Sequence, residues 1–171
     1  MSGDSSSRTI AMIGLFSALY IVSSGIVSFI TQVGYPEHFL RGLLMTSLIV
    51  RTRRKWSATL MGAVSGLVFV FVPAPAPYLL PSTFVSGLVF DLVLMIGTYA
   101  SSSRSTPRLM IAVAVSGVAE SLVALAILTY AGFFGKLFTA LVYAWSTDVV
   151  LNAILSVAGA MIAIRFLPKR V

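Results

Sequence analysis

The sequence contains no cysteine and a single histidine, His38. Without cysteine the chain can form no disulfide, iron–sulfur cluster or thiolate zinc site, and it has no cysteine nucleophile. One histidine also excludes a multi-histidine metal site within one chain. Charged residues make up only 10% of the 171 positions, whereas a soluble domain carries roughly 25%. The composition therefore argues against a water-soluble globular domain.

Apolar residues are abundant instead, at 58% of the chain, and the mean hydropathy is +0.99. About 20 apolar residues cross a bilayer as a helix, and the apolar runs predict an all-α, polytopic membrane protein that forms one domain over residues 1–171. We predict six transmembrane helices, over residues 9–30, 39–50, 56–72, 82–100, 109–130 and 137–164. The proline-rich stretch 73–81 separates the third from the fourth, because prolines at that density cannot continue a helix.

Twelve basic residues stand against five acidic ones, which gives a net charge of +7. With the N-terminus inside, the six helices place ten basic residues on the inner side: Arg8, Arg51, Arg53, Arg54, Lys55, Arg104, Arg108, Arg165, Lys169 and Arg170. Arg41 and Lys136 fall outside. An excess of Lys and Arg marks the cytoplasmic side, so we expect both termini in the cytoplasm and interpret the charge as topology, not as a nucleic-acid footprint. The alternation requires the short segment 39–50 to be a full span, either tilted or extended into Pro36–Arg41.

Three of the five acids, Asp91, Glu120 and Asp148, fall near the middle of the last three predicted helices. Acidic side chains at that depth are costly and usually face a bundle interior or a wet cavity. The predicted helices place no Lys or Arg at the same depth. The acids are therefore expected to bind protons, a metal ion or a cationic ligand, although protonated carboxyls bonded to Ser or Thr across helices are the structural alternative.

The last predicted helix carries Trp145, Asp148 and Asn152 at spacings of three and four residues, which puts them on one face. An aromatic ring, a carboxylate and an amide together suit a heteroaromatic ligand that bears an amine or a positive charge. Phe84, on the predicted helix 82–100, is added to this candidate binding set.

The predicted first outer loop contributes Glu37 and His38, with Arg41 beside it at the outer mouth. These three side chains could close over a ligand. The alternative is a solvated loop from which Arg41 extends outward.

Small residues repeat at four-residue spacing in the first and third predicted helices, at Gly14 and Ala18 and at Gly62 and Gly66. Such spacing lets helices approach closely, and these positions are expected to contact each other or a partner.

Motifs of catalysis are missing from the sequence. It contains no Walker A, no Gly-x-Ser-x-Gly and no His-Glu-x-x-His pattern. We therefore expect no ATP hydrolysis by this chain, no enzymatic activity, no metal and no cofactor.

A small six-helix membrane protein of this topology, with a ligand-like site and no ATPase, resembles the S-component of an energy-coupling factor (ECF) vitamin transporter. The Gly14-x-x-x-Ala18 pattern resembles the Ala-x-x-x-Ala pattern that S-components present to their coupling subunit. The stretch Tyr35-Pro-Glu-His-Phe-Leu-Arg-Gly42 and the pattern Pro81-x5-Gly87-x3-Asp91 are similar in order to S-components of the YkoE type, which serve thiamine and its hydroxymethylpyrimidine precursor.

The resemblance implies that the chain captures a vitamin from outside and then associates with a transmembrane coupling subunit and two ATP-binding subunits. The S-component would topple in the lipid bilayer to release the ligand. It further implies coupling contacts around Gly14, Ala18, Gly62 and Gly66, and ligand binding on the last three helices beneath the first outer loop.

Two other functions remain open at this stage. A proton- or cation-coupled small secondary transporter or channel would use the mid-membrane acids for the ion. A non-transport assembly subunit would pair the acids with bases on a partner protein and would bind no small molecule.

Overall fold

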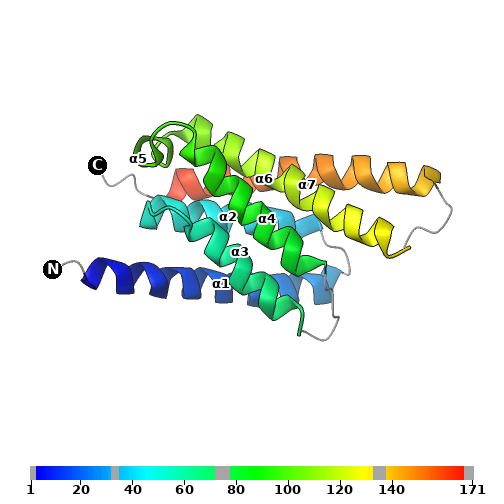
Figure 1. Ribbon diagram of the computed structural model, residues 1–171, viewed down its shortest axis with the longest axis horizontal. Helices are drawn as coiled ribbons and strands as arrows, with labels where there is room; N and C mark the ends of the chain where they lie inside the picture. Colours follow the sequence, from blue (N-terminus) through cyan, green and yellow to red (C-terminus); the bar gives the residue numbers. More distant parts are fainter. Residues whose placement is uncertain (1–2, 32–34, 72–77, 133–137, 168–171) are drawn as a thin grey trace.

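The computed structural model describes residues 3–31, 35–71, 78–132 and 138–167. These residues form seven helices and no strand, which confirms the all-α class. The helices are α1 (Gly3–Thr31), α2 (Tyr35–Thr52), α3 (Ser57–Phe69), α4 (Leu79–Met95), α5 (Tyr99–Ser102), α6 (Thr106–Tyr130) and α7 (Phe138–Phe166) (Figure 1).

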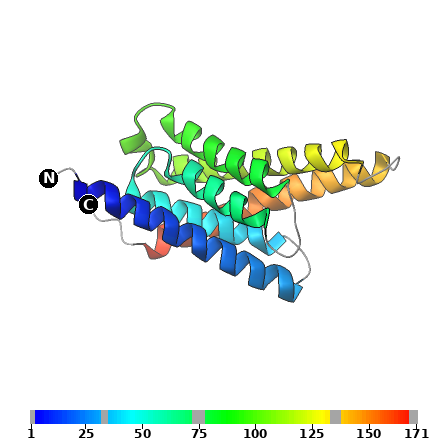
Figure 2. The same cartoon turned by 60° about the horizontal axis from the view of Figure 1, so that its bottom comes forward.

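Six of these helices close into a ring around a common interior. Around the ring, α1 packs on α2, α2 on α7, α7 on α6, α6 on α4, α4 on α3, and α3 on α1 (Figure 1, Figure 2). Helices α2 and α7 are far apart in the sequence, yet they run side by side in the same direction. Side chains from both therefore meet at matched heights in the interior.

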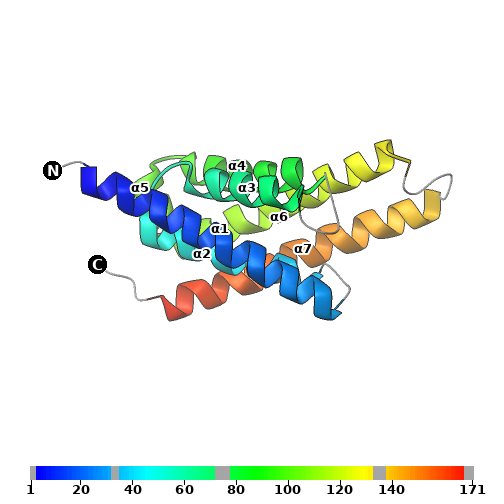
Figure 3. The same cartoon turned by 90° about the horizontal axis from the view of Figure 1, so that it is seen from below.

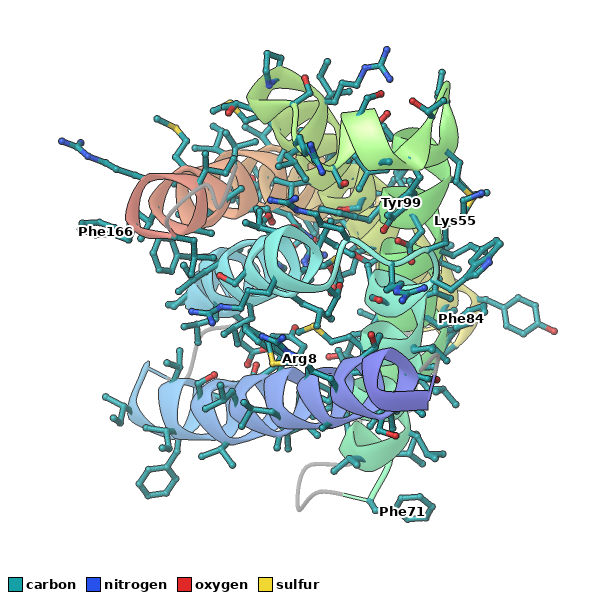
Figure 4. All side chains as sticks on the ribbon, turned by 90° about the vertical axis from the view of Figure 1, so that its left-hand side faces the viewer. Arg8, Lys55, Phe71, Phe84, Tyr99 and Phe166 are labelled. Carbon is teal, nitrogen blue, oxygen red and sulfur yellow. The ribbon has the colours of Figure 1, made fainter. Side chains whose placement is uncertain are left out.

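The start of α1, the end of α7, the α2–α3 turn and α5 all lie at one end of the bundle (Figure 1, Figure 4). This end, which we call the basic end, carries Arg8, Arg51, Arg53, Arg54, Lys55, Arg104, Arg108 and Arg165. The opposite end, where α1 ends and α2 and α4 begin, we call the far end. There α6 and α7 extend beyond the other helices (Figure 3). Lys136, Lys169 and Arg170 lie outside the described residues.

The distribution of polarity is the reverse of that in a water-soluble bundle. Leu15, Ile26 and Val150 are each more than half exposed on the outer surface, whereas Arg41 and Asn152 are 1% and 0% exposed in the interior. Polar side chains inside and large apolar ones outside are what a hydrocarbon environment favours. The apolar exterior therefore indicates a membrane-associated protein.

Three helical segments are long and apolar enough to cross a membrane, namely Ser6–Ile30, Thr106–Tyr130 and Thr139–Phe166. Helices α3 and α4 are apolar but shorter, at 13 and 17 residues, and α2 carries Glu37, Arg41 and Arg51. Length and composition thus support three spans directly, fewer than the six predicted.

Several predicted boundaries are wrong, and two of the shifts matter for the site. Helix α2 begins at Tyr35 rather than at residue 39, since Pro36 suits a first helical turn and Glu37 complements the helix dipole there. Glu37 and His38 therefore belong to a helix and not to a loop. Helix α4 ends at Met95 rather than at residue 100, because Gly97 adopts a φ of +95° and α5 starts afresh after it.

Gly62 and Gly66 serve the packing of α3 against α4 inside the chain. A Cβ at Gly62 would meet the carbonyl of Thr83, and a Cβ at Gly66 would lie 2.9 Å from the Leu80 Cα. Gly87 on α4 makes the reciprocal approach to Ala58. The expectation that Gly62 and Gly66 face a partner protein is therefore wrong: α4 occupies that face.

Candidate functional site

Arg41 occupies the centre of the helix ring and joins four helices. Its Nη1 donates to Ser86 Oγ on α4 at 3.0 Å. Its Nη2 donates to Asn152 Oδ1 at 2.5 Å and to Ser156 Oγ at 2.6 Å, both on α7. On α6, Glu120 forms an ion pair with Arg41. The guanidinium therefore has a carboxylate and three neutral acceptors around it, which is the environment that a buried charge requires.

The central network continues through amide and hydroxyl groups. Asn152 Nδ2 donates to Ser121 Oγ at 2.8 Å, and Ser156 Oγ lies 3.1 Å from the main-chain oxygen of His38. Gly117 leaves room for the Asn152 side chain, because a Cβ at residue 117 would lie 2.8 Å from Asn152 Oδ1. The network ties α2, α6 and α7 together around the buried ion pair.

Two expectations from the sequence are wrong at this centre. Arg41 does not extend outward from a loop, because the earlier start of α2 carries it almost two turns into the bundle, where it is 1% exposed. Glu120 is not a carboxylate without a base, since Arg41 neutralises it. Both residues hold the helices together and are removed from the set that can face a ligand.

Toward the far end, the next polar contacts lie at the start of α2. His38 Nε2 is 3.4 Å from Asp148 Oδ1, and the two side chains are 16% and 27% exposed. Glu37, beside His38, accepts a hydrogen bond from Ser28 on α1. The ring of Tyr35 lies 6.5 Å from that of His38. These side chains are accessible, unlike those of the central network.

Trp145 lies about one turn before Asp148 on α7, nearer to the start of that helix at the far end. Its Nε1 is buried and has no hydrogen-bond partner among the described residues. A buried indole N–H normally finds an acceptor. Among the described residues, Trp145 therefore carries an unpaired donor about one helical turn from Asp148.

We call Glu37, His38, Trp145 and Asp148 the acidic mouth. Among the described residues, His38 is the basic side chain in contact with Asp148, and the charge of Arg41 also acts on that carboxylate from farther inside the bundle. With a neutral imidazole the acidic mouth holds two negative charges. The arrangement can attract a cation and offer it an aromatic face, a carboxylate and an indole donor.

Asp91 has a structural task at the other end of the molecule. It is fully buried and sits four residues before the end of α4. Its Oδ2 accepts from the Thr59 main-chain N and from Thr59 Oγ1, each at 2.8 Å. The N-cap residue of α3, Trp56, makes no side-chain cap. Asp91 therefore caps α3 from a neighbouring helix and satisfies an N–H that helix starts leave unpaired.

Tyr99 on α5 completes this cap. Its hydroxyl lies 2.8 Å from Asp91 Oδ1 and 3.0 Å from the Arg54 carbonyl oxygen. Burial raises the pKa of the Tyr99 hydroxyl, and the Asp91 carboxylate raises it further. The hydroxyl thus keeps its proton and donates it. The expectation that Asp91 lies at mid-membrane among ligand-facing acids is wrong.

Replacing Asp91 with alanine should lower the free energy of unfolding by about 1–3 kcal/mol, because the buried Thr59 N–H and the Tyr99 hydroxyl lose their acceptor. Denaturant unfolding of the purified protein measures the loss. Tyr99→Phe removes one of the three contacts and should cost less. A variant of normal stability and impaired ligand binding would contradict the structural role.

The remaining predicted residues lie outside the cluster. Phe84 is 39% exposed on the outer side of α4 (Figure 4), and its place in a binding site stays a prediction. Gly14 and Ala18 are exposed on α1, and no atom lies within 4 Å of a Cβ placed on Gly14. This face of α1 is uncovered by the described part of the chain.

Sequence reasoning missed the buried serines Ser86, Ser121 and Ser156. One signal could have found the last of them. The spacing that joins Trp145, Asp148 and Asn152 continues with one more step of four to Ser156, and Ser156 contacts both Asn152 and Arg41. No comparable pattern marks the serines of α4 and α6.

No known protein family, curated protein or solved structure matches this chain.

Proposed function

We propose that the chain is the substrate-binding S-component of an ECF-type importer, and that it takes up thiamine or its hydroxymethylpyrimidine precursor. In this proposal all six long helices span the membrane and both termini are cytoplasmic. Three observations support the topology: the helices close into a ring, the start of α1 and the end of α7 lie on one side, and the described basic residues collect at that end. The far end would face outward.

The observation that carries the proposal is the acidic mouth. Thiamine combines a permanent positive charge with an aminopyrimidine ring. A cation and a flat ring suit the face of Trp145, and an exocyclic amine suits a carboxylate such as Asp148. The unused Trp145 N–H adds a donor for a ring nitrogen. A neutral pyrimidine would use the same carboxylate through its amine alone.

The exposed face of α1 supports the partner assignment. Gly14 and Ala18 are exposed there, and in the described part of the chain no atom lies within 4 Å of a Cβ placed on Gly14. Small residues permit the close approach of another helix. A transmembrane coupling subunit would pack here, and two partner subunits would hydrolyse ATP. Gly62 and Gly66 are not included in this contact surface, because they face α4.

Tryptophan fluorescence of the purified chain, titrated with thiamine and then with hydroxymethylpyrimidine, tests the proposal. The sequence has two tryptophans, and Trp56 lies at the basic end, away from the acidic mouth. Saturable quenching that disappears in Trp145→Phe would support binding at the acidic mouth. Absence of a response to both ligands would reject this substrate class.

Replacing Asp148 with asparagine should weaken thiamine binding tenfold or more, which corresponds to about 1.4 kcal/mol. The variant keeps the shape of the side chain and removes its charge. Arg51→Ala, exposed at the basic end, is the matched control and should bind as the wild-type chain does. Equal affinity of both variants would remove Asp148 from the site.

A proton-coupled secondary transporter is the second candidate, and the His38–Asp148 pair favours it, since such pairs serve as proton relays in membranes. Uptake into liposomes that follows a pH gradient without any ATPase would support this function. A non-transport assembly subunit predicts that the isolated chain binds neither ligand.

A further inference from the structure

We infer that His38 is a specificity-determining residue: its protonated imidazole competes with a cationic ligand for the Asp148 carboxylate, so that binding of a cation releases a proton. The inference rests on the proposed function, because it concerns ligand binding at the same acidic mouth.

His38 already contacts the Asp148 carboxylate, which is the group that we assign to the cationic ligand. His38 Nε2 is 3.4 Å from Asp148 Oδ1, and both side chains are partly exposed. The main chain of His38 is fixed by the central network, since its main-chain oxygen is 3.1 Å from Ser156 Oγ. A ligand cation that pairs with Asp148 must therefore take the place that the imidazolium would occupy.

Several charged or titratable groups surround His38, and an imidazole is the group type among them that can change charge near neutral pH. On its own helix these are Tyr35, Glu37 and, one turn inward, Arg41. From α7 it faces Asp148, and beyond Arg41 lies Glu120 on α6. Carboxylates, tyrosine and arginine ordinarily keep one charge state between pH 5 and 8, and imidazole does not.

The nearest groups on α1 and before α4 fit this assignment. Ser28 on α1 reaches only Glu37 and carries no charge. Burial raises the pKa of Tyr78, which precedes α4, and the charges of Glu37 and Asp148 raise it further. Tyr78 therefore stays neutral near neutral pH.

Charge then distinguishes two ligands that share an aminopyrimidine ring. With neutral His38, the carboxylates of Glu37 and Asp148 have no protonated imidazole beside them, and they favour a permanent cation. With protonated His38, Asp148 is already paired and a second cation is disfavoured. A neutral pyrimidine does not replace that positive charge, so its affinity should depend less on the state of His38.

The test compares the affinities of thiamine and hydroxymethylpyrimidine at about pH 6 and about pH 8, measured by tryptophan quenching. One competing proton changes affinity by at most tenfold per pH unit, and thiamine should bind about threefold or more tighter at the higher pH. Hydroxymethylpyrimidine should change by less than about twofold. In weakly buffered solution, thiamine should release up to one proton per site at the lower pH.

Variants assign the effect to one residue. His38→Gln keeps a hydrogen-bonding side chain and should make thiamine binding independent of pH. Glu37→Gln is the matched control beside it: it should weaken thiamine binding and preserve the pH dependence.

The outcomes distinguish this inference from the proposed function. Thiamine binding that is equal at both pH values, or a pH dependence that survives in His38→Gln or is equally large for hydroxymethylpyrimidine, would overturn the inference and leave the proposed function standing. If His38→Gln does not fold, the comparison of the two ligands on the wild-type chain decides. Failure of both ligands to bind at either pH would reject the proposed function and the inference together.

Discussion

Replacing Arg41 with methionine is expected to lower the free energy of unfolding by about 3–5 kcal/mol. The change leaves Glu120, which is 6% exposed, without its cation, and it removes the donor to Ser86, Asn152 and Ser156. Methionine fills much of the same space, so the loss reflects charge and hydrogen bonding more than a cavity. Unfolding of the purified protein in detergent with increasing denaturant measures it.

Two further variants separate the causes. Arg41→Met combined with Glu120→Leu removes both charges and should regain much of the lost stability, because a buried pair replaced by apolar residues is often neutral. Arg8→Met, exposed on α1, should change stability by no more than about 0.5 kcal/mol. An Arg41→Met single variant of wild-type stability would show that the contacts of Arg41 do not stabilise the packing of α2, α4, α6 and α7.

Replacing Gly42 with alanine should cost about 3 kcal/mol or more and should abolish ligand binding. A Cβ at Gly42 would meet the main chain of Ser156 far inside contact distance, and Gly159 makes the corresponding approach to Phe39 and Leu43. Main-chain atoms cannot relieve the clash by changing rotamer, as a side chain could, so α2 and α7 must move apart. That movement would also part His38 from Asp148. Unfolding and thiamine titration check both effects.

Gly14→Ala is the matched control for this prediction. A Cβ at Gly14 has no atom within 4 Å, and alanine is favoured over glycine in a helix by about 0.5–1 kcal/mol. The isolated variant should therefore be slightly more stable and should bind ligand normally. Equal behaviour of Gly42→Ala and Gly14→Ala would mean that α2 and α7 are not closely packed.

The apolar runs of the sequence predicted the helices themselves, since length and hydropathy decide which segments can be helical in a membrane. Their ends were less accurate. Gly97 and Pro36 are visible in the sequence as possible helix boundaries. Whether a single glycine or proline ends or begins a helix within an apolar run depends on the neighbouring helices. The four-residue shift at the start of α2 moved His38 and Glu37 from a loop into a helix.

The sequence by itself determined an all-helical chain with an apolar exterior, a strongly basic end and one face of α7 that carries Trp145, Asp148 and Asn152. These follow from local spacing and composition. Only the tertiary structure decided that Arg41 pairs with Glu120, that Asp91 caps α3, and that Gly62 and Gly66 face α4. Those partners are 14 or more residues apart in the sequence. The order of helices around the ring, not the periodicity of any one helix, determines which side chains meet.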